Sequence, residues 1–360
     1  MIICNYLNRT VIGTIINKEY GSDFHLCVDT EFRQTEGSFI FSDRKSFALY
    51  FSGRAAIFSL LKFGADYLGW KKAYFPSYYC HEVVHFVQPL SMDIEYYEFN
   101  PFLDSFSKDI EIEDRPENVI INVCFFGTTK LDSHGYTRSV IIDDITHDIF
   151  SYRESQADYC FASLRKFVPL PCGGICYSPK GRKLPHADLN KESERVALQK
   201  IAAMVLKKDY LEGLIQEKEL WRAQMIDVER QFDGEFTKSG MPEVVQAIFS
   251  GLNVKAIIEA KKRNLKEAFS LLKKNKLNDL LVATNENAYG LLLVVGSFRE
   301  REQLKQYLIS KNIFPAVLWP GQLNPRDSEM EKKILFVHVD YRYDADDMNY
   351  IVDTLSQFFQ

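Results

Sequence analysis

The sequence predicts an α/β protein with a large, mostly parallel α/β domain and a smaller C-terminal α+β domain. Three observations support this prediction. Short apolar runs alternate with helix-like stretches in the middle of the chain, and most of these runs are apolar throughout, as in strands covered on both faces. Turn-forming Pro, Gly, Asn and Ser residues separate the runs. After a long helical region, the last part of the chain returns to strand-like and helix-like stretches.

The elements of the large domain follow one another in a regular order. Apolar residues recur at helical spacing after Gly53, over residues 57–68. Strands are then expected at residues 73–75, 94–99, 119–126, 140–145, 159–162 and 174–177. Together these elements indicate a layered α/β domain over about residues 40–180.

The rest of the chain is predicted to be helical and then mixed. Residues 190–275 are rich in Lys, Glu, Leu and Ala, and Pro242 fits a helix start, so residues 244–274 are expected to form one long helix, either straight or bent. Beyond it, strands are expected at residues 280–283, 290–297 and 334–339, and helices at residues 300–311 and 346–358.

A length of 360 residues corresponds to about two domains. We expect a large domain over residues 46–245 and a small domain over residues 246–360. Residues 1–45 are expected to form an N-terminal segment that packs on the small domain or on a partner subunit.

The composition excludes several classes of protein. Lys and Arg number 44 against 49 Asp and Glu, a formal net charge of −5, so the basic excess of a nucleic-acid-binding protein is absent. No run approaches the ~18 apolar residues of a membrane span, and the first residues do not resemble a secretory signal. Because the seven cysteines show no disulfide spacing, we expect a cytoplasmic protein.

The most informative segment runs from Ser163 to Gly174. Lys166 follows a short apolar strand and precedes a Pro- and Gly-rich turn, after which another strand begins. A lysine at a strand end can face a pocket, where burial would lower its pKa and make the amine nucleophilic toward aldehydes. The alternative interpretation is a solvated lysine in a loop.

Two adjacent carboxylates, Asp143 and Asp144, end the next informative strand, and His147 lies three residues further on. Ligands of α/β sheets collect at the carboxyl ends of strands, where a carboxylate can hold a ring nitrogen protonated or bind a metal. Neighbouring residues of a strand point to opposite faces, so we expect one of the two carboxylates to face the ligand. The alternative is an Asp that caps the following helix.

A third segment, Ser52–Gly53–Arg54, opens the predicted helix. Free backbone N–H groups and the helix dipole at such an end can bind a phosphate group. A Ser-Gly pair before a helix is common, so this segment alone is a weak signal.

Taken together, these segments resemble the fold type I aminotransferases that depend on pyridoxal phosphate (PLP), and most closely the DegT/DnrJ/EryC1 group of sugar-nucleotide aminotransferases. The resemblance covers roughly residues 50–355 in a consistent order. It consists of the phosphate turn, Phe75–Pro76–Ser77–Tyr78–Tyr79, Phe125–Phe126–Gly127, Asp144-x-x-His147, and Ser163-x-x-Lys166 followed by Gly173–Gly174.

This resemblance implies a role for each matching residue. Lys166 would form the internal aldimine with PLP and then move the proton between substrate and cofactor. Asp144 would pair with the pyridine nitrogen and keep the ring cationic, so that the ring can accept the electrons of a carbanion. His147 would contact the phenolic oxygen or the face of the ring.

The remaining cofactor residues also follow from the resemblance. Ser163 would donate to the phosphate, and Gly53 and Arg54 would offer backbone amides to it. Tyr79 is the first candidate for the aromatic ring that stacks on the cofactor and Tyr78 the second, with core packing as the alternative for either.

Arg342 is a candidate substrate-binding residue because a small-domain Arg often binds a substrate carboxylate in fold type I enzymes. The alternative is a surface Arg paired with Asp344 or Asp346. We expect no metal site, because no second pair of ligands with zinc spacing accompanies Cys80, His81 and His85.

The sequence also departs from the family pattern. The segment before Lys166 is two residues shorter than usual, and Arg54 replaces the usual Thr. The usual Gly-Tyr-Asn-Tyr-Arg, whose Asn reaches the partner's phosphate, is not present, and residues 236–240 lie near its place. These differences concern the sugar-nucleotide substrate more than the cofactor.

The resemblance therefore implies a homodimeric PLP-dependent aminotransferase with active sites at the subunit interface. It would move an amino group from an amino-acid donor to a keto substrate, such as a keto-sugar, with ping-pong kinetics. The expected partners are these small molecules, not nucleic acid or membrane. Two alternatives stand: a PLP enzyme of another reaction type on an amino-acid-like substrate, and a non-catalytic binding or regulatory module with this fold.

Overall fold

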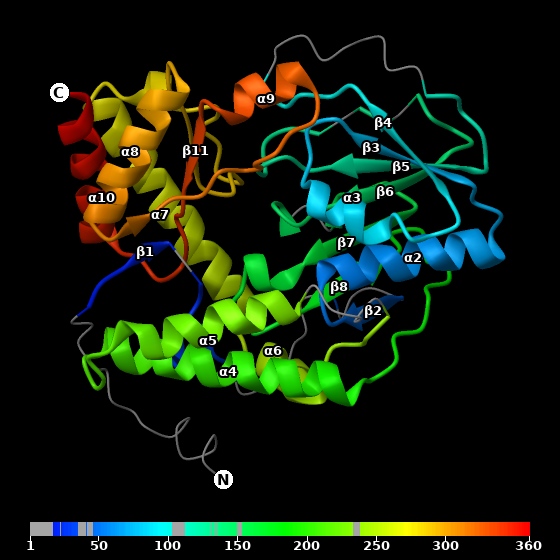
Figure 1. Ribbon diagram of the computed structural model, residues 1–360, viewed down its shortest axis with the longest axis horizontal. Helices are drawn as coiled ribbons and strands as arrows, with labels where there is room; N and C mark the ends of the chain where they lie inside the picture. Colours follow the sequence, from blue (N-terminus) through cyan, green and yellow to red (C-terminus); the bar gives the residue numbers. More distant parts are fainter. Residues whose placement is uncertain are drawn as a thin grey trace.

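The computed structural model describes residues 17–21, 23–34, 41, 46–102, 112–130, 132–133, 135–149, 153–232 and 238–360. Its main feature is a seven-stranded sheet in the order β2-β8-β7-β6-β5-β3-β4 (Figure 1). The strands are β2 (Phe47–Tyr50), β3 (Lys72–Pro76), β4 (Asp93–Tyr97), β5 (Asn118–Val123), β6 (Val140–Asp144), β7 (Tyr159–Ser163) and β8 (Gly174–Tyr177).

The sheet is mostly parallel, as predicted. The strands β4, β3, β5, β6 and β7 pair in parallel, whereas β8 is antiparallel to both β7 and β2. Every residue of β5, β6 and β8 is buried, which explains the consecutive apolar residues in these strands. The prediction of an α/β fold with a mostly parallel sheet is therefore confirmed.

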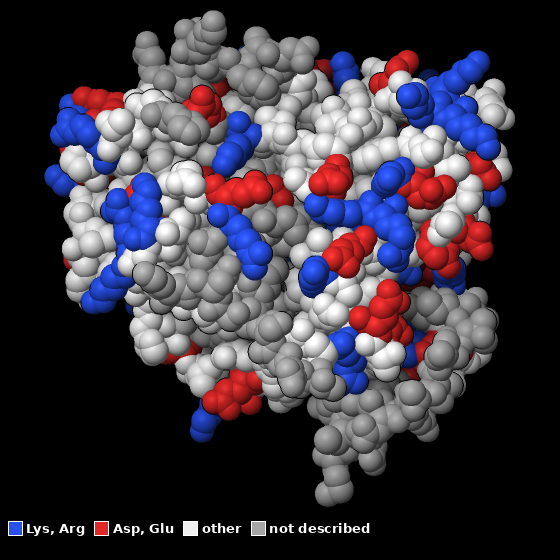
Figure 2. Space-filling model, turned by 180° about the vertical axis from the view of Figure 1, so that it is seen from behind, with Lys and Arg blue, Asp and Glu red and all other residues white. Residues whose placement is uncertain are grey.

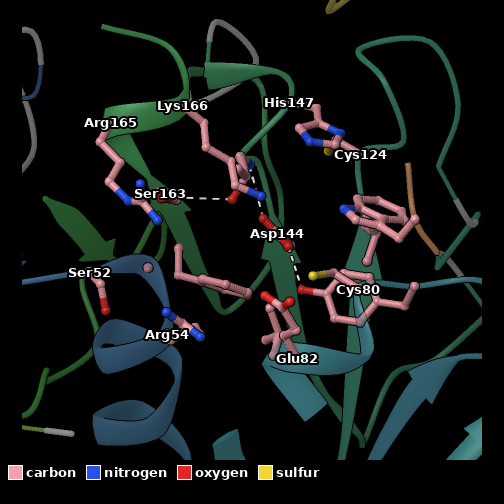
Figure 3. A pocket seen from close by; sticks show the side chains of 17 residues that line it. Ser52, Arg54, Cys80, Glu82, Cys124, Asp144, His147, Ser163, Arg165 and Lys166 are labelled. Carbon is pink, nitrogen blue, oxygen red and sulfur yellow. Dashed lines mark hydrogen bonds between the residues drawn. The ribbon is translucent and has the colours of Figure 1, made fainter. Parts of the chain in front are cut away.

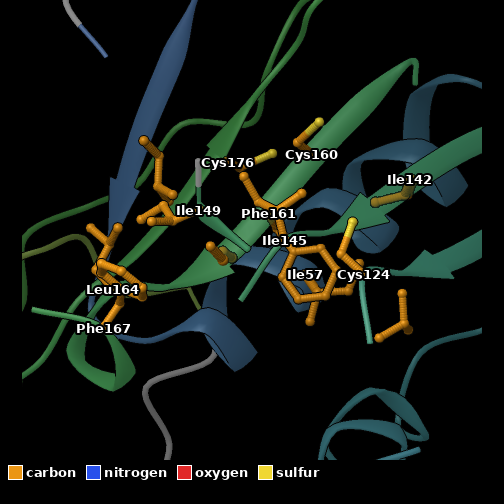
Figure 4. Packing of buried hydrophobic residues seen from close by; sticks show 14 of the residues in the cluster. Ile57, Cys124, Ile142, Ile145, Ile149, Cys160, Phe161, Leu164, Phe167 and Cys176 are labelled. Carbon is orange, nitrogen blue, oxygen red and sulfur yellow. The ribbon is translucent and has the colours of Figure 1, made fainter. Parts of the chain in front are cut away.

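Helix α2 (Gly53–Tyr67) packs on the β7 and β8 side of the sheet, and α3 (His81–Val87) lies next to it (Figure 1). The Ser52 hydroxyl caps α2, accepting a hydrogen bond from the backbone N–H of Ala55 at 3.1 Å. Ile57 of α2, Ile142 of β6 and Phe161 of β7 belong to one buried cluster (Figure 4). This packing fixes the start of α2 relative to the strand ends.

The helical region contains α4 (Lys191–Leu211) and α5 (Lys218–Gln231), which pack side by side (Figure 1), followed by α6 (Glu243–Ser250) and α7 (Val254–Lys274). The prediction of one long helix over residues 244–274 is wrong, because the chain breaks between α6 and α7. Gly251 ends the first helix, and the Asn253 side chain caps the second by accepting from the Ala256 N–H at 3.1 Å.

The last part of the chain has its own hydrophobic cluster, to which α7, β9, α8, β11 and α10 contribute. Here β9 (Leu291–Val294) pairs antiparallel with β11 (Ile334–Val337), and the helices are α8 (Phe298–Ser310), α9 (Pro325–Glu331) and α10 (Ala345–Phe359). The expected strand at residues 280–283 is wrong: the chain forms a 3₁₀ turn, η4 (Asn278–Leu280), and then a single bridge from Leu281 to Leu293. Four apolar residues were too short a run to decide between these structures.

The described N-terminal residues contact this last part of the chain. Strand β1 (Tyr20–Gly21) pairs in parallel with β10 (Ile313–Phe314), and the Tyr20 hydroxyl donates to Asp347 at 2.9 Å. A 3₁₀ turn, η1 (Thr30–Phe32), follows β1 and precedes β2. Residues 1–16 lie outside the described residues, and the predicted domain limits stay a prediction.

None of the described helices is long and apolar enough to cross a membrane. Basic and acidic side chains are interspersed on the face that Figure 2 shows. Six of the seven cysteines are described, all with free thiols: Cys80 is half-buried, and the others are Cys27, Cys124, Cys160, Cys172 and Cys176, all buried.

Candidate active site

A pocket lies at the carboxyl ends of the parallel strands, where β6 ends at Asp144 and β7 ends at Ser163 (Figure 3). The structure brings all seven predicted cofactor residues together in its lining: Gly53, Arg54, Tyr79, Asp144, His147, Ser163 and Lys166. These residues are separated by up to 113 positions in the sequence, so the topology of the sheet, not local sequence, assembles them.

One wall of the pocket is the N-terminus of α2. A Cβ atom on Gly53 would lie 2.9 Å from the Ser163 Cβ, and one on Gly174 would lie 2.1 Å from the Ser52 carbonyl oxygen. The turn therefore sits directly against the ends of β7 and β8, and only glycine fits at both places. The first N–H groups of a helix have no partner within it, so this end of α2 offers donors and a positive dipole to an anion.

Asp144 forms the floor of the pocket and is buried. Its Oδ2 accepts from the Tyr79 hydroxyl at 2.5 Å, and its Oδ1 accepts from the backbone N–H of Thr146 at 2.9 Å. Burial raises the pKa of Asp144 above its usual value, against the effect of these donors. Asp143 instead points away from the pocket, to Ser155 and Asn122. A buried carboxylate with only neutral donors is suited to a cationic ligand.

His147 lies in a column of nearly parallel rings. Its ring centroid is 4.2 Å from that of Tyr289 and 5.3 Å from that of Trp319, with interplanar angles of 16° and 13°. Burial, with Lys166 and Lys261 nearby, lowers the pKa of His147 well below its usual value. The imidazole is therefore neutral and presents an aromatic group to the pocket.

Lys166 ends the 3₁₀ turn η3 (Leu164–Lys166), which continues from β7. Its side chain extends into the pocket (Figure 3), and the Tyr289 hydroxyl donates to its carbonyl oxygen at 2.9 Å. The burial expected for this lysine from the sequence is not observed, because the residue is exposed. Of the described residues lining the pocket, Lys166 alone carries a primary amine.

Sequence reasoning missed several residues of the pocket, among them Cys80, Glu82, Thr146, Arg165 and Trp319. Arg165 and Thr146 could have been found, because each lies next to or near a predicted site residue. Trp319 gave no local signal, because it follows the site lysine by more than 150 residues. It belongs to the last part of the chain, which the fold brings back to the pocket.

The structure places Arg342 outside this pocket, in an adjoining cavity that Lys166 and His147 also line. The Arg342 guanidinium forms a bidentate pair with Asp340, with Nε–Oδ1 at 3.0 Å and Nη2–Oδ2 at 2.7 Å. It also donates to the carbonyl oxygens of Gly21 and Asp23. Arg342 therefore links the N-terminal segment to the end of the chain.

We expect Arg342→Gln to destabilise the protein by about 3–5 kcal/mol, because it leaves Asp340 buried without its counter-charge. Burial alone would raise the pKa of Asp340, but Arg342 outweighs this effect and holds that pKa below its usual value. Urea unfolding measures the loss, and the double variant with Asp340→Asn should recover part of it. Equal stability of Arg342→Gln and wild type would contradict a structural role.

The chain is similar to known proteins in its fold but not detectably in its sequence. No protein-family model and no curated protein sequence matches the chain. Among solved structures, PseC of Helicobacter pylori, an aminotransferase in the biosynthesis of pseudoaminic acid, matches with a TM-score of 0.58 at 11% identity over 95% of this chain and 99% of its own.

Two further solved structures match in the same way. Spr1654 of Streptococcus pneumoniae, described as a sugar aminotransferase, gives a TM-score of 0.57 at 14% identity over 89% of this chain and 88% of its own. NtdA of Bacillus subtilis, solved with bound pyridoxamine phosphate, gives 0.58 at 14% identity over 88% and 74%. The chain thus has the fold of the fold type I PLP-dependent enzymes, which confirms the predicted fold class.

Proposed function

We propose that this protein is a PLP-dependent aminotransferase, which moves an amino group from an amino-acid donor to a keto substrate. The observation that carries the proposal is the meeting of one amine, Lys166, and one buried carboxylate, Asp144, in a pocket whose wall is the N-terminus of α2. The names of the matching structures, several of them sugar aminotransferases, support a keto-sugar as the acceptor. A cytoplasmic homodimer is part of the same proposal.

The residues of the pocket fit PLP. The glycine turn, which has no room for a Cβ at Gly53, places the N-terminus of α2 in the pocket wall, where its positive dipole would favour the phosphate, and Ser163 lies against that turn. Asp144 has no cationic partner within salt-bridge distance among the described residues, so a pyridinium nitrogen would supply the charge that burial of the carboxylate requires.

When bound, the cofactor would supply an electron sink for the substrate carbanion. The protein's own groups would do the rest. In the absence of substrate, the Lys166 Nζ would hold the cofactor's aldehyde carbon. During the reaction, the same nitrogen would carry the proton. Asp144 would orient the ring and keep its nitrogen protonated, and the neutral His147 would contact the ring without competing for that proton.

The test is a cofactor titration followed by two half-reactions. Purified protein with added PLP should develop a yellow absorption band that borohydride removes, leaving the cofactor bound covalently to a lysine peptide. L-Glutamate should then bleach the band, and 2-oxoglutarate should restore it. A protein that shows no band at saturating PLP would contradict the proposal and favour the non-catalytic module.

Tyr79→Phe should shift the pH dependence of the bound cofactor. The Tyr79 hydroxyl donates to the ionised form of Asp144, so its loss should raise the pKa of that carboxyl further. The acid limb of the kcat/KM profile should therefore move to higher pH. Phe retains the ring, so a role limited to stacking would leave the limb in place, and Tyr97→Phe, a buried tyrosine outside the pocket lining, is the control.

A further inference from the structure

Arg165, the residue before the site lysine, occupies a junction in the molecule. It lines the candidate active site, the adjoining cavity that contains Arg342, and a third groove beside α5. It is the one described residue shared by all three linings. Arg165 therefore lies where the candidate active site adjoins both neighbouring cavities, and Figure 3 shows it beside Lys166.

The hydrogen bonds of Arg165 use only one side of its guanidinium. Nη1 donates to Glu229 Oε1 at 2.9 Å, and the group stacks on the Phe232 ring, with Cζ 4.6 Å from the ring centroid. Nε is buried and has no hydrogen-bond partner among the described residues, and no described residue accepts from Nη2. The Nε–Nη2 edge is thus positioned but unpaired.

Arg342 shows what this edge binds. There the same two nitrogens, Nε and Nη2, hold both oxygens of Asp340 side by side. A carboxylate, like a phosphate, has two oxygens that match this edge. In Arg342 a protein carboxylate fills the edge, which leaves no such edge for a substrate, whereas no described residue fills the same edge of Arg165.

Glu229, the hydrogen-bond partner of Arg165, also has a second cationic partner. Its Oε1 accepts from the Lys200 Nζ at 2.6 Å, and that Nζ lies 3.4 Å from the Asp23 Oδ1. The charge of Glu229 therefore stays compensated by Lys200 if Arg165 binds a ligand. The stacking on Phe232 holds the Arg165 guanidinium in place, so ligand binding requires no change in its position.

We propose that Arg165 binds the α-carboxylate of the amino donor through its Nε–Nη2 edge. The amino group of the same donor would then lie next to Lys166, where the cofactor is held. This inference rests on the proposed function and adds to it the residue that selects a carboxylate-bearing substrate. It assigns this role to the residue beside the lysine, in place of Arg342. The amino and α-carboxylate groups of one amino acid share a carbon atom, which suits two adjacent protein residues.

The test compares Arg165→Gln with wild type, both loaded with PLP. Bleaching of the yellow band is titrated with L-glutamate and with L-isoglutamine, in which an amide replaces the α-carboxylate. We expect the apparent Kd for L-glutamate to rise about 10- to 100-fold, the range for a hydrogen bond between charged groups, and that for L-isoglutamine to change little. Arg165→Lys, which keeps the charge but not the edge, should recover part of the affinity.

Three measurements keep the test decisive. Arg195→Gln, which removes an exposed arginine of α4 that pairs with Glu192 outside all three linings, is the matched control and should bind L-glutamate like wild type. The thermal midpoint of each variant shows that it is folded. The Kd for PLP itself separates the substrate carboxylate from the cofactor phosphate as the anion at Arg165, and it should stay within about twofold of wild type.

Each contrary result has a distinct meaning. Equal losses for L-glutamate and L-isoglutamine, or no loss for either, would overturn the inference while the proposed function stands. A higher Kd for PLP in Arg165→Gln would overturn it too, and would assign Arg165 to the cofactor phosphate. A wild-type protein that takes up no PLP would contradict the proposed function itself.

Discussion

Lys166→Ala should lose covalent capture of PLP and slow transamination by about 10²–10⁴-fold, the range for removal of a residue that transfers protons. The reason is that no other described residue of the pocket lining carries a primary amine. Absorption spectra before and after borohydride, with peptide mass mapping, measure the capture, and single-turnover bleaching measures the rate.

The control for this variant is Lys62→Ala, which removes a half-buried lysine of α2 that pairs with Asp66 and lies outside the pocket lining. It should capture PLP at Lys166 as wild type does. Added methylamine should restore part of the rate to Lys166→Ala, because a small amine can enter the open pocket and carry the proton. A borohydride-fixed cofactor in Lys166→Ala would contradict the assignment of the amine.

Asp144→Asn is the second variant with a large expected effect, a fall in kcat of about 10²–10³-fold, as for loss of one preorganised electrostatic contact. An amide cannot supply the negative charge that keeps a ring nitrogen protonated. The thermal midpoint without cofactor should fall little or rise, because the variant removes a charge whose burial is unfavourable. The spectrum of bound PLP and its pH dependence report the change directly.

Asp143→Asn is the matched control, one residue away on the opposite face of β6. Asp143 bonds to Ser155 and Asn122 and lies outside the pocket lining. It should change stability more than turnover. If both variants lost activity equally, the assignment of Asp144 to the ring nitrogen would be wrong.

The strands around the site could be predicted because their signals are local. An apolar run that ends in Asp144, and another that ends shortly before Lys166, place two reactive groups at the same edge of a parallel sheet. The break between α6 and α7 also has local signals, because Gly251 ends one helix and Asn253 caps the next. Helical periodicity on both sides of the break nevertheless favoured a continuous helix.

Other features depend on contacts between distant parts of the chain. The exposure of Lys166 depends on how closely the last part of the chain approaches the pocket, which no local pattern encodes. For the same reason, Trp319 next to His147 was not foreseen. Arg342 had a plausible sequence context for a substrate residue, but the position of Asp340 relative to its guanidinium is a property of the folded backbone.

The burial of the thiols makes the cysteines natural reporters of opening. Burial raises the pKa of Cys27 and Cys160 to about 12, so an alkylating reagent reaches them as thiolates only when the chain unfolds. Cys80 differs, because it is half-buried and lines the pocket. The rate of its alkylation would therefore record whether the pocket is filled, while the rates at the other two record global unfolding, so one labelling time course separates ligand occupancy from stability.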